Sequence, residues 1–491
     1  MTGTIGSAKH YDMVVIGSGA AGHHGAIQAA KLGKKVLVVE RSKALGGTSI
    51  NTGTIPSKTL REAVLRSTLS GSADRRISAS DLAQRIEEVS SNEVQVFENQ
   101  FRRNDIDVSI GSASFSGPHT IRVANQEEEY FCHADYILIA AGSRPAHNDA
   151  IPVDDISIID TDAIRRLRTE HHVLTIVGGG VIGIEYACIA CALDIPVTVI
   201  ERRPRILDFV DQEIVEALSY HLRSQGVTFR LGEEVEEVTK SSDGKVGAKL
   251  KSGKQIWSDA LLYAVGRQAN TDSLNLAACG LAADARGRIQ VNTNFQTAQP
   301  HIYAAGDVIG FPSLSSVSME QGRIAACHAF GIPVVSVAEL FPYGIYSIPE
   351  ISFVGKTEEQ LTEAGVSYEI GIAHYREIAR GQILDDTSGL LKLLFHRDTH
   401  QLLGVHIVGE GATELIHIGQ AVIGFKGTID TFVNTVFNYP TLAECYKVAA
   451  LNGLNRLKYS GEPSFNRQSE SLDQTSTIVQ AEAHAEAREK N

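Results

Sequence analysis

The chain has 491 residues, 43% of them hydrophobic and 21% charged, with a formal net charge of −13 at pH 7. A chain of this length is too long to fold around a single hydrophobic core, so we expect several domains. The composition is that of a globular protein. The acidic balance argues against nucleic acid or an anionic membrane as a partner, and without a signal-like start or a bilayer-length apolar run we expect a cytoplasmic location.

The first predicted elements form a strand, a glycine turn, a helix and a second strand. Residues 11–16 are an apolar strand that runs into Gly17-Ser18-Gly19-Ala20-Ala21-Gly22, and a helix follows to Leu32. The second strand, residues 35–39, ends in Glu40. In a dinucleotide fold the first glycine permits the tight turn, the second lets the backbone approach a pyrophosphate, and the third packs the helix on the strand. The helix N-terminus then faces the phosphates, and the acidic residue accepts hydrogen bonds from a ribose.

The same pattern returns later in the chain. Residues 173–177 precede Gly178-Gly179-Gly180-Val181-Ile182-Gly183, a helix runs to about Leu193, and a strand at 196–200 ends in Glu201. A single glycine turn can be merely structural, but two copies with correctly spaced glutamates predict two dinucleotide sites. Before the second copy, residues 67–129 predict a polar helical insertion followed by strands, and residues 131–144 return to the first sheet.

Three further segments complete the predicted fold. Residues 261–267 have the shape of a closing strand for the second unit, and residues 301–307 form another strand-to-turn element that ends in Asp307. From about residue 341 alternating strands and two helices predict a separate α+β domain to about 459. Residues 461–491 are polar and predict a mobile tail.

The two glycine turns, the Gly-Gly-x-x-x-Asn-x-Gly-x-Ile-Pro-Ser-Lys stretch at 46–58 and the Ala-Ala-Gly-Asp element at 304–307 together resemble the pyridine nucleotide-disulfide oxidoreductase family. The resemblance covers roughly residues 10–460 and implies an α/β fold with two Rossmann-like dinucleotide-binding domains and a C-terminal α+β dimerisation domain. The implied boundaries are 1–160 and 281–340 for the FAD-binding domain, 161–280 for the NAD(P)-binding domain, 341–460 for the dimerisation domain and 461–491 for a disordered tail. A homodimer or larger homo-oligomer is expected.

The resemblance also implies the site. Lys58 is expected to point at flavin N5 and to pair with Glu185, and these two are the expected catalytic residues. Asp307 is expected to bind the ribitol chain of FAD. The cofactor-binding residues expected for FAD, NAD(H) and NADP(H) are Gly17, Gly19, Gly22, Glu40, Arg41, Gly47, Thr48, Ser49, Lys58, Ala141, Gly142, Asp307, Ser315, Gly178, Gly180, Gly183, Glu201, Arg202 and Gly266. No metal site is expected.

The departures from the family pattern bear on the reaction. Ser49 and Thr54 stand where the disulfide reductases carry two cysteines, and Tyr439 stands where they carry the histidine that takes the thiol's proton. A hydroxyl cannot replace a thiolate in disulfide chemistry. Residues 53–58, 437–441 and 449–457 look most like the members that pass hydride between NADPH/NADP+ and NADH/NAD+ through FAD, the Si-specific class. Members of that subgroup often keep a cysteine at the position of Ser49.

Other polar patterns have structural interpretations. Cys188 and Cys191 form a CxxC inside a predicted helix, where cysteines usually pack as small apolar residues. The pairs His23-His24 and His171-His172 lack metal-ligand spacing. Glu201 favours NAD(H) because its carboxylate can accept a hydrogen bond from a ribose 2′-hydroxyl. Arg202, Arg203 and Arg205 follow it, and they are either ligands of a 2′-phosphate or part of a solvated basic turn.

Two other functions are compatible with these residues. An NAD(P)H:quinone or dye reductase needs the same cofactors and an open second face of the flavin. A silent dihydrolipoamide dehydrogenase-like paralogue would be a binding or scaffold subunit, and the intact glycine turns, Lys58 and Asp307 argue against it.

Overall fold

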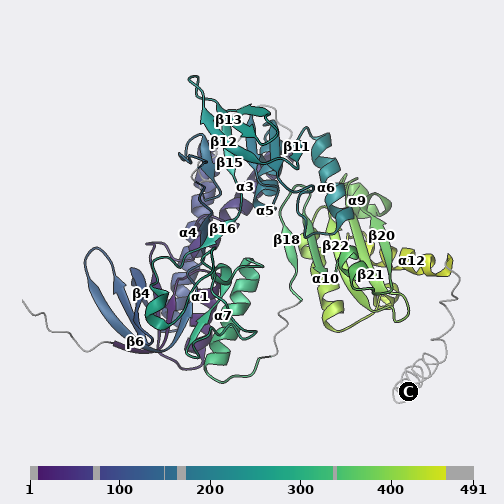
Figure 1. The fold of residues 1–491 in the computed structure, drawn as a ribbon. Helices are drawn as coiled ribbons and strands as arrows, with labels where there is room; N and C mark the ends of the chain where they lie inside the picture. Colours follow the sequence, from purple (N-terminus) through teal and green to yellow (C-terminus); the bar gives the residue numbers. More distant parts are fainter. Residues whose placement is uncertain (1–8, 70–77, 149, 163–172, 335–339, 460–491) are drawn as a thin grey trace, which may run out of the picture. The chain divides into compact units, whose positions relative to one another are not determined.

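The computed structural model describes residues 9–69, 78–148, 150–162, 173–334 and 340–459. The predicted tail at 461–491 and the pair His171-His172 lie outside these residues. The described residues fall into two compact units, of which the smaller comprises Phe209–Leu218, Pro342–Ile345 and the chain from Pro349 onward. Figure 1 shows both units and labels many of their elements. No described helix has the length and apolar character needed to span a membrane.

The first sheet of the larger unit has seven strands in the order β3-β2-β1-β6-β5-β4, with β17 also paired to β6. β1, β2, β3, β6 and β17 are parallel, whereas β4 and β5 add an antiparallel extension. All five residues of β2 are buried, as expected for a parallel strand covered on both faces. The strands are β1 (Lys9–Ile16), β2 (Val36–Glu40), β3 (Asp107–Ile110), β4 (Ser112–Gly117), β5 (Thr120–Ala124), β6 (Glu129–Ile139) and β17 (Ile302–Ala304).

Helices α1 (Ala20–Lys31) and α7 (Ser315–Ala329) pack against each other beside this sheet. Their close approach depends on Gly322, whose Cβ would lie 2.0 Å from the carbonyl oxygen of Ala21. Helices α2 (Gly47–Asn51), α3 (Thr54–Leu69) and α4 (Ala79–Arg103) lie between β2 and β3 in the chain, and α4 lies within the insertion predicted at residues 67–129. Ser78 caps α4 by accepting a hydrogen bond from the backbone N–H of Asp81.

The second sheet is parallel, with the order β11-β10-β9-β15-β8. A three-stranded antiparallel sheet, β12-β13-β14, packs one apolar face into the same core. A short ribbon of β7 with β16 joins the segments that leave β6 and β15. The elements are β7 (Ser143–Pro145), β8 (Ile158–Asp160), β9 (Leu174–Val177), α5 (Val181–Ala192), β10 (Val197–Glu201), α6 (Gln212–Ser224), β11 (Thr228–Leu231), β12 (Val235–Lys240), β13 (Val246–Leu250), β14 (Gln255–Ser258), β15 (Ala260–Tyr263), β16 (Arg267–Ala269) and the 3₁₀ turns η2 (Leu276–Cys279) and η3 (Gly306–Ile309).

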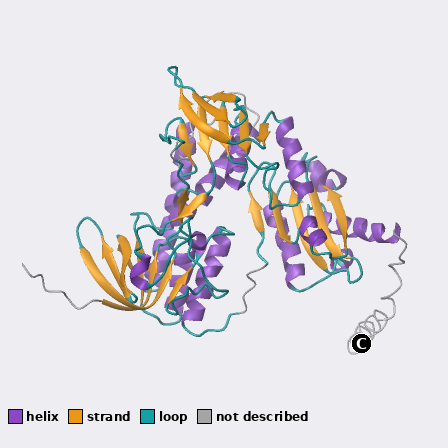
Figure 2. Ribbon diagram, in the orientation of Figure 1, coloured by secondary structure: helices purple, strands orange, loops and turns teal. Residues whose placement is uncertain are grey.

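The smaller unit is an antiparallel sheet in the order β18-β19-β22-β21-β20, with helices beside it (Figure 2). The strands are β18 (Tyr343–Ile345), β19 (Ile351–Gly355), β20 (Tyr368–His374), β21 (Leu390–His396) and β22 (Leu402–Val408). The helices are α8 (Glu358–Glu363), η4 (Tyr375–Glu377), α9 (Ala379–Ile383), α10 (Ala412–Gly424), α11 (Asp430–Asn434) and α12 (Glu444–Tyr459).

The expectation of two helices in this region was too low. The structure adds α8, α9 and α11, each of five or six residues, to the longer α10 and α12. Helices this short bury too few residues to show a helical period. α8 depends instead on a local capping box, in which Thr357 and Gln360 bond each other's backbone N–H groups.

Candidate functional site

The glycines of the first turn have three distinct environments. Gly17 has φ of 103°, and a Cβ there would lie 2.4 Å from the carbonyl oxygen of Ala140. A Cβ on Gly22 would lie 1.9 Å from the carbonyl oxygen of Gly17, so both positions are closed by the protein itself. A Cβ on Gly19 would meet nothing nearer than 3.9 Å. The space above Gly19, at the N-terminus of α1, is therefore open to a ligand, as a pyrophosphate would require.

The second turn repeats this arrangement. Gly178 has φ of 113°, and a Cβ there would lie 2.5 Å from the carbonyl oxygen of Ala264. A Cβ on Gly183 would lie 2.0 Å from the carbonyl oxygen of Gly178. Nothing lies within 4 Å of a Cβ on Gly180, which precedes α5. The two turns thus have the same division into two closed glycines and one open glycine. Both fit the phosphates of a dinucleotide.

A buried glutamate ends the strand that follows each glycine turn and its helix, which is β2 for the first turn and β10 for the second. Glu40 accepts hydrogen bonds from the N–H and hydroxyl of Ser18, at 2.9 and 2.7 Å, and from the N–H of Ser42 at 2.9 Å. Glu201 accepts from the N–H of Gly179 at 2.7 Å. Each carboxylate is anchored beside its own glycine turn, where the nucleotide's ribose would follow the pyrophosphate.

The arginines after Glu201 differ in what they contact. Arg203 donates from Nε to Oε1 of Glu201 at 2.9 Å and from Nη2 to Oε2 at 3.0 Å, and it also pairs with Asp208 at 2.5 Å. Burial alone would raise the pKa of Glu201, but the hydrogen bonds from Arg203 and Gly179 outweigh it and lower that pKa. Arg202 is exposed and has no hydrogen bond or ion pair within the described chain. Arg202 is therefore the guanidinium that is free to meet a phosphate.

Lys58 and Glu185 form an ion pair in the larger unit. Nζ of Lys58, on α3, lies 2.7 Å from Oε2 and 2.9 Å from Oε1 of Glu185, on α5. Only 5% of the Glu185 side chain is exposed, against 24% of Lys58. Tyr346 completes the group, since its N–H donates to Glu185 at 2.9 Å and its ring lies 4.8 Å from Nζ of Lys58. The sequence implied the pair, but nothing in the local pattern marked Tyr346.

Three hydroxyl groups meet where the disulfide reductases carry their cysteines. The Ser315 hydroxyl, at the start of α7, lies 2.8 Å from that of Ser49 and 3.1 Å from that of Thr54. The three side chains are half-buried and satisfy one another. A hydroxyl cluster of this kind can hold a proton or orient a ligand, but it cannot form a disulfide.

Asp307 lies at the end of a polar chain that the sequence did not predict. Its Oδ2 accepts from the Ser143 hydroxyl at 2.5 Å, and that hydroxyl accepts from Nε of Arg267 at 2.8 Å. Arg267 also pairs with Asp162 at 2.9 Å. Ser143 and Arg267 are on the β7–β16 ribbon, which joins the segments that leave β6 and β15. This chain of hydrogen bonds therefore links the carboxylate of Asp307 to residues near both glycine turns.

The remaining expected site residues lie at the edges of the two turns. Gly47 approaches Gly19 closely, because its Cβ would lie 3.0 Å from the Cα of Gly19. Ala141 and Gly142 follow the end of β6, and Gly266 is exposed with φ of 85°. Thr48 lies on α2, directly after Gly47. Arg41 is exposed, and it too lacks a hydrogen bond or ion pair in the described ranges.

All six cysteines are free, and burial raises the pKa of each thiol. The pKa of Cys188 rises to about 12. Cys188 and Cys191 lie in α5 as the helical packing residues that the sequence predicted, and neither is a poised thiolate.

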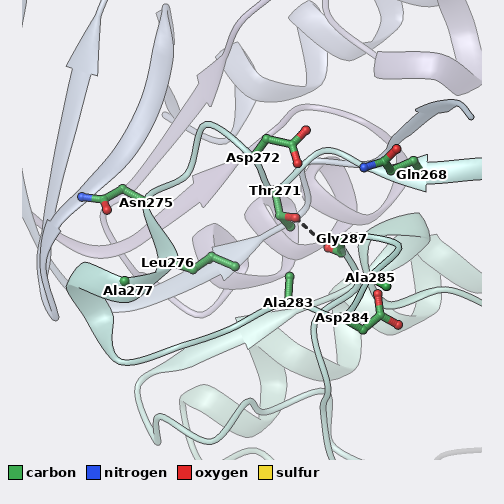
Figure 3. A pocket seen from close by; sticks show the side chains of 10 residues that line it. All are labelled: Gln268, Thr271, Asp272, Asn275, Leu276, Ala277, Ala283, Asp284, Ala285 and Gly287. Carbon is green, nitrogen blue, oxygen red and sulfur yellow. Dashed lines mark hydrogen bonds between the residues drawn. The ribbon is translucent and has the colours of Figure 1, made fainter. Parts of the chain in front are cut away.

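A hollow of about 300 Å³ lies in the segment between β16 and β17 (Figure 3). Its two carboxylates are already paired, Asp272 with Arg144 and Asp284 with Arg288. None of its lining residues belongs to a glycine turn, so we assign no nucleotide to it.

The fold and the two glycine turns define a flavoprotein oxidoreductase built to hold two dinucleotides. Residues 11–322 match the family model described as pyridine nucleotide-disulphide oxidoreductase, and residues 341–450 match that family's dimerisation domain. The chain belongs to the pyridine nucleotide-disulphide oxidoreductase family. This confirms the fold class and the family expected from the sequence.

Curated proteins named soluble pyridine nucleotide transhydrogenase match most of the chain. Over 461 residues the chain is 51% identical to a soluble pyridine nucleotide transhydrogenase of Mycobacterium bovis, covering 92% of this chain and 98% of that one. It is 45% identical over 460 residues to the protein of the same name in Escherichia coli, with coverage of 91% and 98%.

Solved structures of two other proteins share the fold. The HOCl-induced flavoprotein disulfide reductase RclA of Escherichia coli matches with a TM-score of 0.83 at 28% identity, covering 90% of this chain and 99% of that chain. LpdA of Mycobacterium tuberculosis matches with a TM-score of 0.84 at 25% identity and the same coverage.

Proposed function

We propose that this protein is an FAD-dependent transhydrogenase of the Si-specific class, which moves hydride between NADPH/NADP+ and NADH/NAD+ without a redox disulfide. The observation that carries the proposal is the hydroxyl cluster of Ser49, Thr54 and Ser315 at the family's disulfide position. The 51% and 45% identity to proteins named as transhydrogenases supports it.

The two open glycines suit two different nucleotides. In the proposal Gly19, with Glu40 and Asp307, holds FAD, and Gly180, with Glu201, holds the nicotinamide nucleotide. When bound, FAD supplies the hydride chemistry, so the chain has only to bind, orient and exclude water. Glu185 and the Tyr346 ring keep the Lys58 ammonium in one position, where it offers a fixed positive charge.

One nicotinamide site would have to accept both NAD(H) and NADP(H). The Glu201 carboxylate is suited to a ribose 2′-hydroxyl, and the exposed guanidinium of Arg202 is suited to a 2′-phosphate. Because Arg203 already neutralises Glu201, a nearby phosphate meets less repulsion than an unpaired carboxylate would give. This combination favours a site that discriminates weakly between the two nucleotides.

The domain roles are also part of the proposal. Residues 1–160 and 281–340 would bind FAD, 161–280 would bind NAD(P), and 341–460 would form a homodimer in the cytoplasm. The match of residues 341–450 to a dimerisation domain supports the last assignment.

Steady-state assays separate this function from its rivals. With NADPH as donor we expect reduction of NAD+ to exceed reduction of a quinone, and no turnover of lipoamide or oxidised glutathione. A faster rate with quinone would favour an NAD(P)H:acceptor reductase. Strong lipoamide turnover would contradict the disulfide-free mechanism.

A further inference from the structure

Four histidines and an aspartate gather at the start of β1, at the end of the strand opposite Gly17. They come from separate parts of the chain: His10 on β1, His119 in the β4–β5 turn, His133 and Asp135 on β6, and His301 before β17. At about 3.3 Å per residue, β1 places His10 roughly 20 Å from Gly17. The group is therefore distinct from the nucleotide sites.

Strand pairing brings three of these side chains together. His10 is the direct partner of His133 in the parallel β1–β6 register, and Asp135 lies two residues further along β6, on the same face of the sheet. Nε2 of His10 lies 3.0 Å from Oδ1 of Asp135. One ligand atom from each of the three side chains lies within 4.8 Å of the other two, and all three side chains are exposed.

Two more imidazoles support this group from one side. The ring of His119 stacks on His133 with centroids 5.4 Å apart, and His301 stacks on His119 at 3.9 Å. Nδ1 of His119 lies 2.8 Å from the carbonyl oxygen of Ala134, and since a carbonyl only accepts, this nitrogen carries the proton. Burial and the neighbouring His119 lower the pKa of His301.

We propose that His10, His133 and Asp135 bind one divalent transition-metal ion of the kind that prefers imidazole ligands, with Zn²⁺ as the probe. Two imidazole nitrogens and one carboxylate oxygen are a usual three-ligand set for such ions, and water fills the remaining position. Bond lengths of about 2.0–2.2 Å require ligand atoms no more than roughly 4.4 Å apart. Exposed side chains reach that spacing by small rotations, and the proton between His10 and Asp135 leaves as the ion binds.

A second cluster of possible metal ligands is already occupied by a lysine side chain. Asp211, Glu213 and Glu358 are also close enough to share an ion, but the buried ammonium of Lys392 already pairs with all three. His10, His133 and Asp135 hold no such internal cation among the described residues. The histidine group is thus the better metal candidate.

The test is calorimetric titration of the FAD-loaded protein with Zn²⁺ after accessible thiols have been alkylated. We expect about one ion per chain, with affinity that falls as the pH is lowered, because protons compete with the metal for its ligand atoms. His133→Ala and Asp135→Asn should each weaken binding by about tenfold or more. The matched control is His417→Ala, which removes an exposed histidine on α10 and should change nothing.

Equal affinity in wild type and His133→Ala, or no saturable binding up to about 100 μM Zn²⁺, would overturn the proposal and leave His10–Asp135 as a surface ion pair of little energetic weight. Neither His133→Ala nor Asp135→Asn should change hydride transfer, because both side chains lie on β6 beside the start of β1, at the end of that strand opposite Gly17.

Discussion

At the scale of single residues, the structure separates two arginines that the sequence treats as equivalent. Arg202 is exposed and unpaired within the described residues, whereas Arg203 is bound to Glu201 and Asp208. We expect Arg202→Ala to weaken NADPH use by about ten- to hundredfold and to spare NADH use, because one charged hydrogen bond is worth roughly 1.5–3 kcal/mol.

Arg203→Ala is the informative comparison for this prediction. It should impair NADH use, which Arg202→Ala should spare, because it releases Glu201 from its anchoring pair. It should weaken NADPH use further, because the unpaired Glu201 carboxylate then repels the 2′-phosphate. The measurement is kcat/KM for NADPH and for NADH in both variants. An equal loss for both nucleotides in Arg202→Ala would show that Arg202 does not read the 2′-phosphate.

His23 predicts how stability depends on pH. Its ring is buried against Phe97, and burial, with the neighbouring His24, lowers its pKa to about 4 although the side chain of Gln100 opposes this shift. Below about pH 6.5 the unfolded chain binds a proton that the folded chain refuses, so stability falls as the pH drops from about 6.5 to about 4, by up to roughly 3 kcal/mol.

The leucine variant of His23 tests this assignment. His23→Leu should flatten the acid side of a plot of unfolding free energy against pH, measured in urea between pH 7 and pH 4.5. An unchanged slope would assign the acid sensitivity to other groups.

At the scale of elements, the two glycine turns offer a matched pair of variants. Gly19→Val and Gly180→Val each place a side chain in open space, so the protein should fold in both cases. Gly19→Val should purify without flavin, because the side chain takes the space of the FAD pyrophosphate. Gly180→Val should remain yellow but lose NAD(P)H oxidation. Absorbance at the flavin band and the NADPH titration distinguish the two, and loss of flavin in Gly180→Val would contradict the assignment.

The same elements show how far the sequence could predict the structure. Strong local patterns predicted β1, β2, β9 and β10 to within one or two residues of their bounds, since a buried strand followed by a glycine turn leaves few alternatives. The Lys58–Glu185 pair followed from the family resemblance. The position of Tyr346, the Arg267–Ser143–Asp307 chain of hydrogen bonds and the histidine group could not be predicted, because each joins segments more than a hundred residues apart through tertiary packing.

At the scale of the whole molecule, the smaller unit exposes large apolar side chains. Val436 is 91% exposed, Phe425 89% and Tyr439 74%, which is unusual for side chains that gain by burial. The proposed homodimer would cover such side chains. Val436→Asp should therefore shift the protein toward monomer in sedimentation velocity, while Tyr220→Asp, at a 77% exposed position on α6 in the larger unit, should not. A monomeric wild-type protein would contradict the proposed dimer.

In the proposed mechanism, hydride passes between two nicotinamide nucleotides at one site and without thiols. The most direct measurement is the initial rate of NAD+ reduction by NADPH, over a grid of both concentrations, in protein whose accessible thiols have been alkylated. We expect rates close to those of untreated protein and parallel double-reciprocal lines, because NADP+ must leave before NAD+ can bind. Loss of the rate on alkylation would show that a thiol takes part, and intersecting lines would show two nucleotides bound at once.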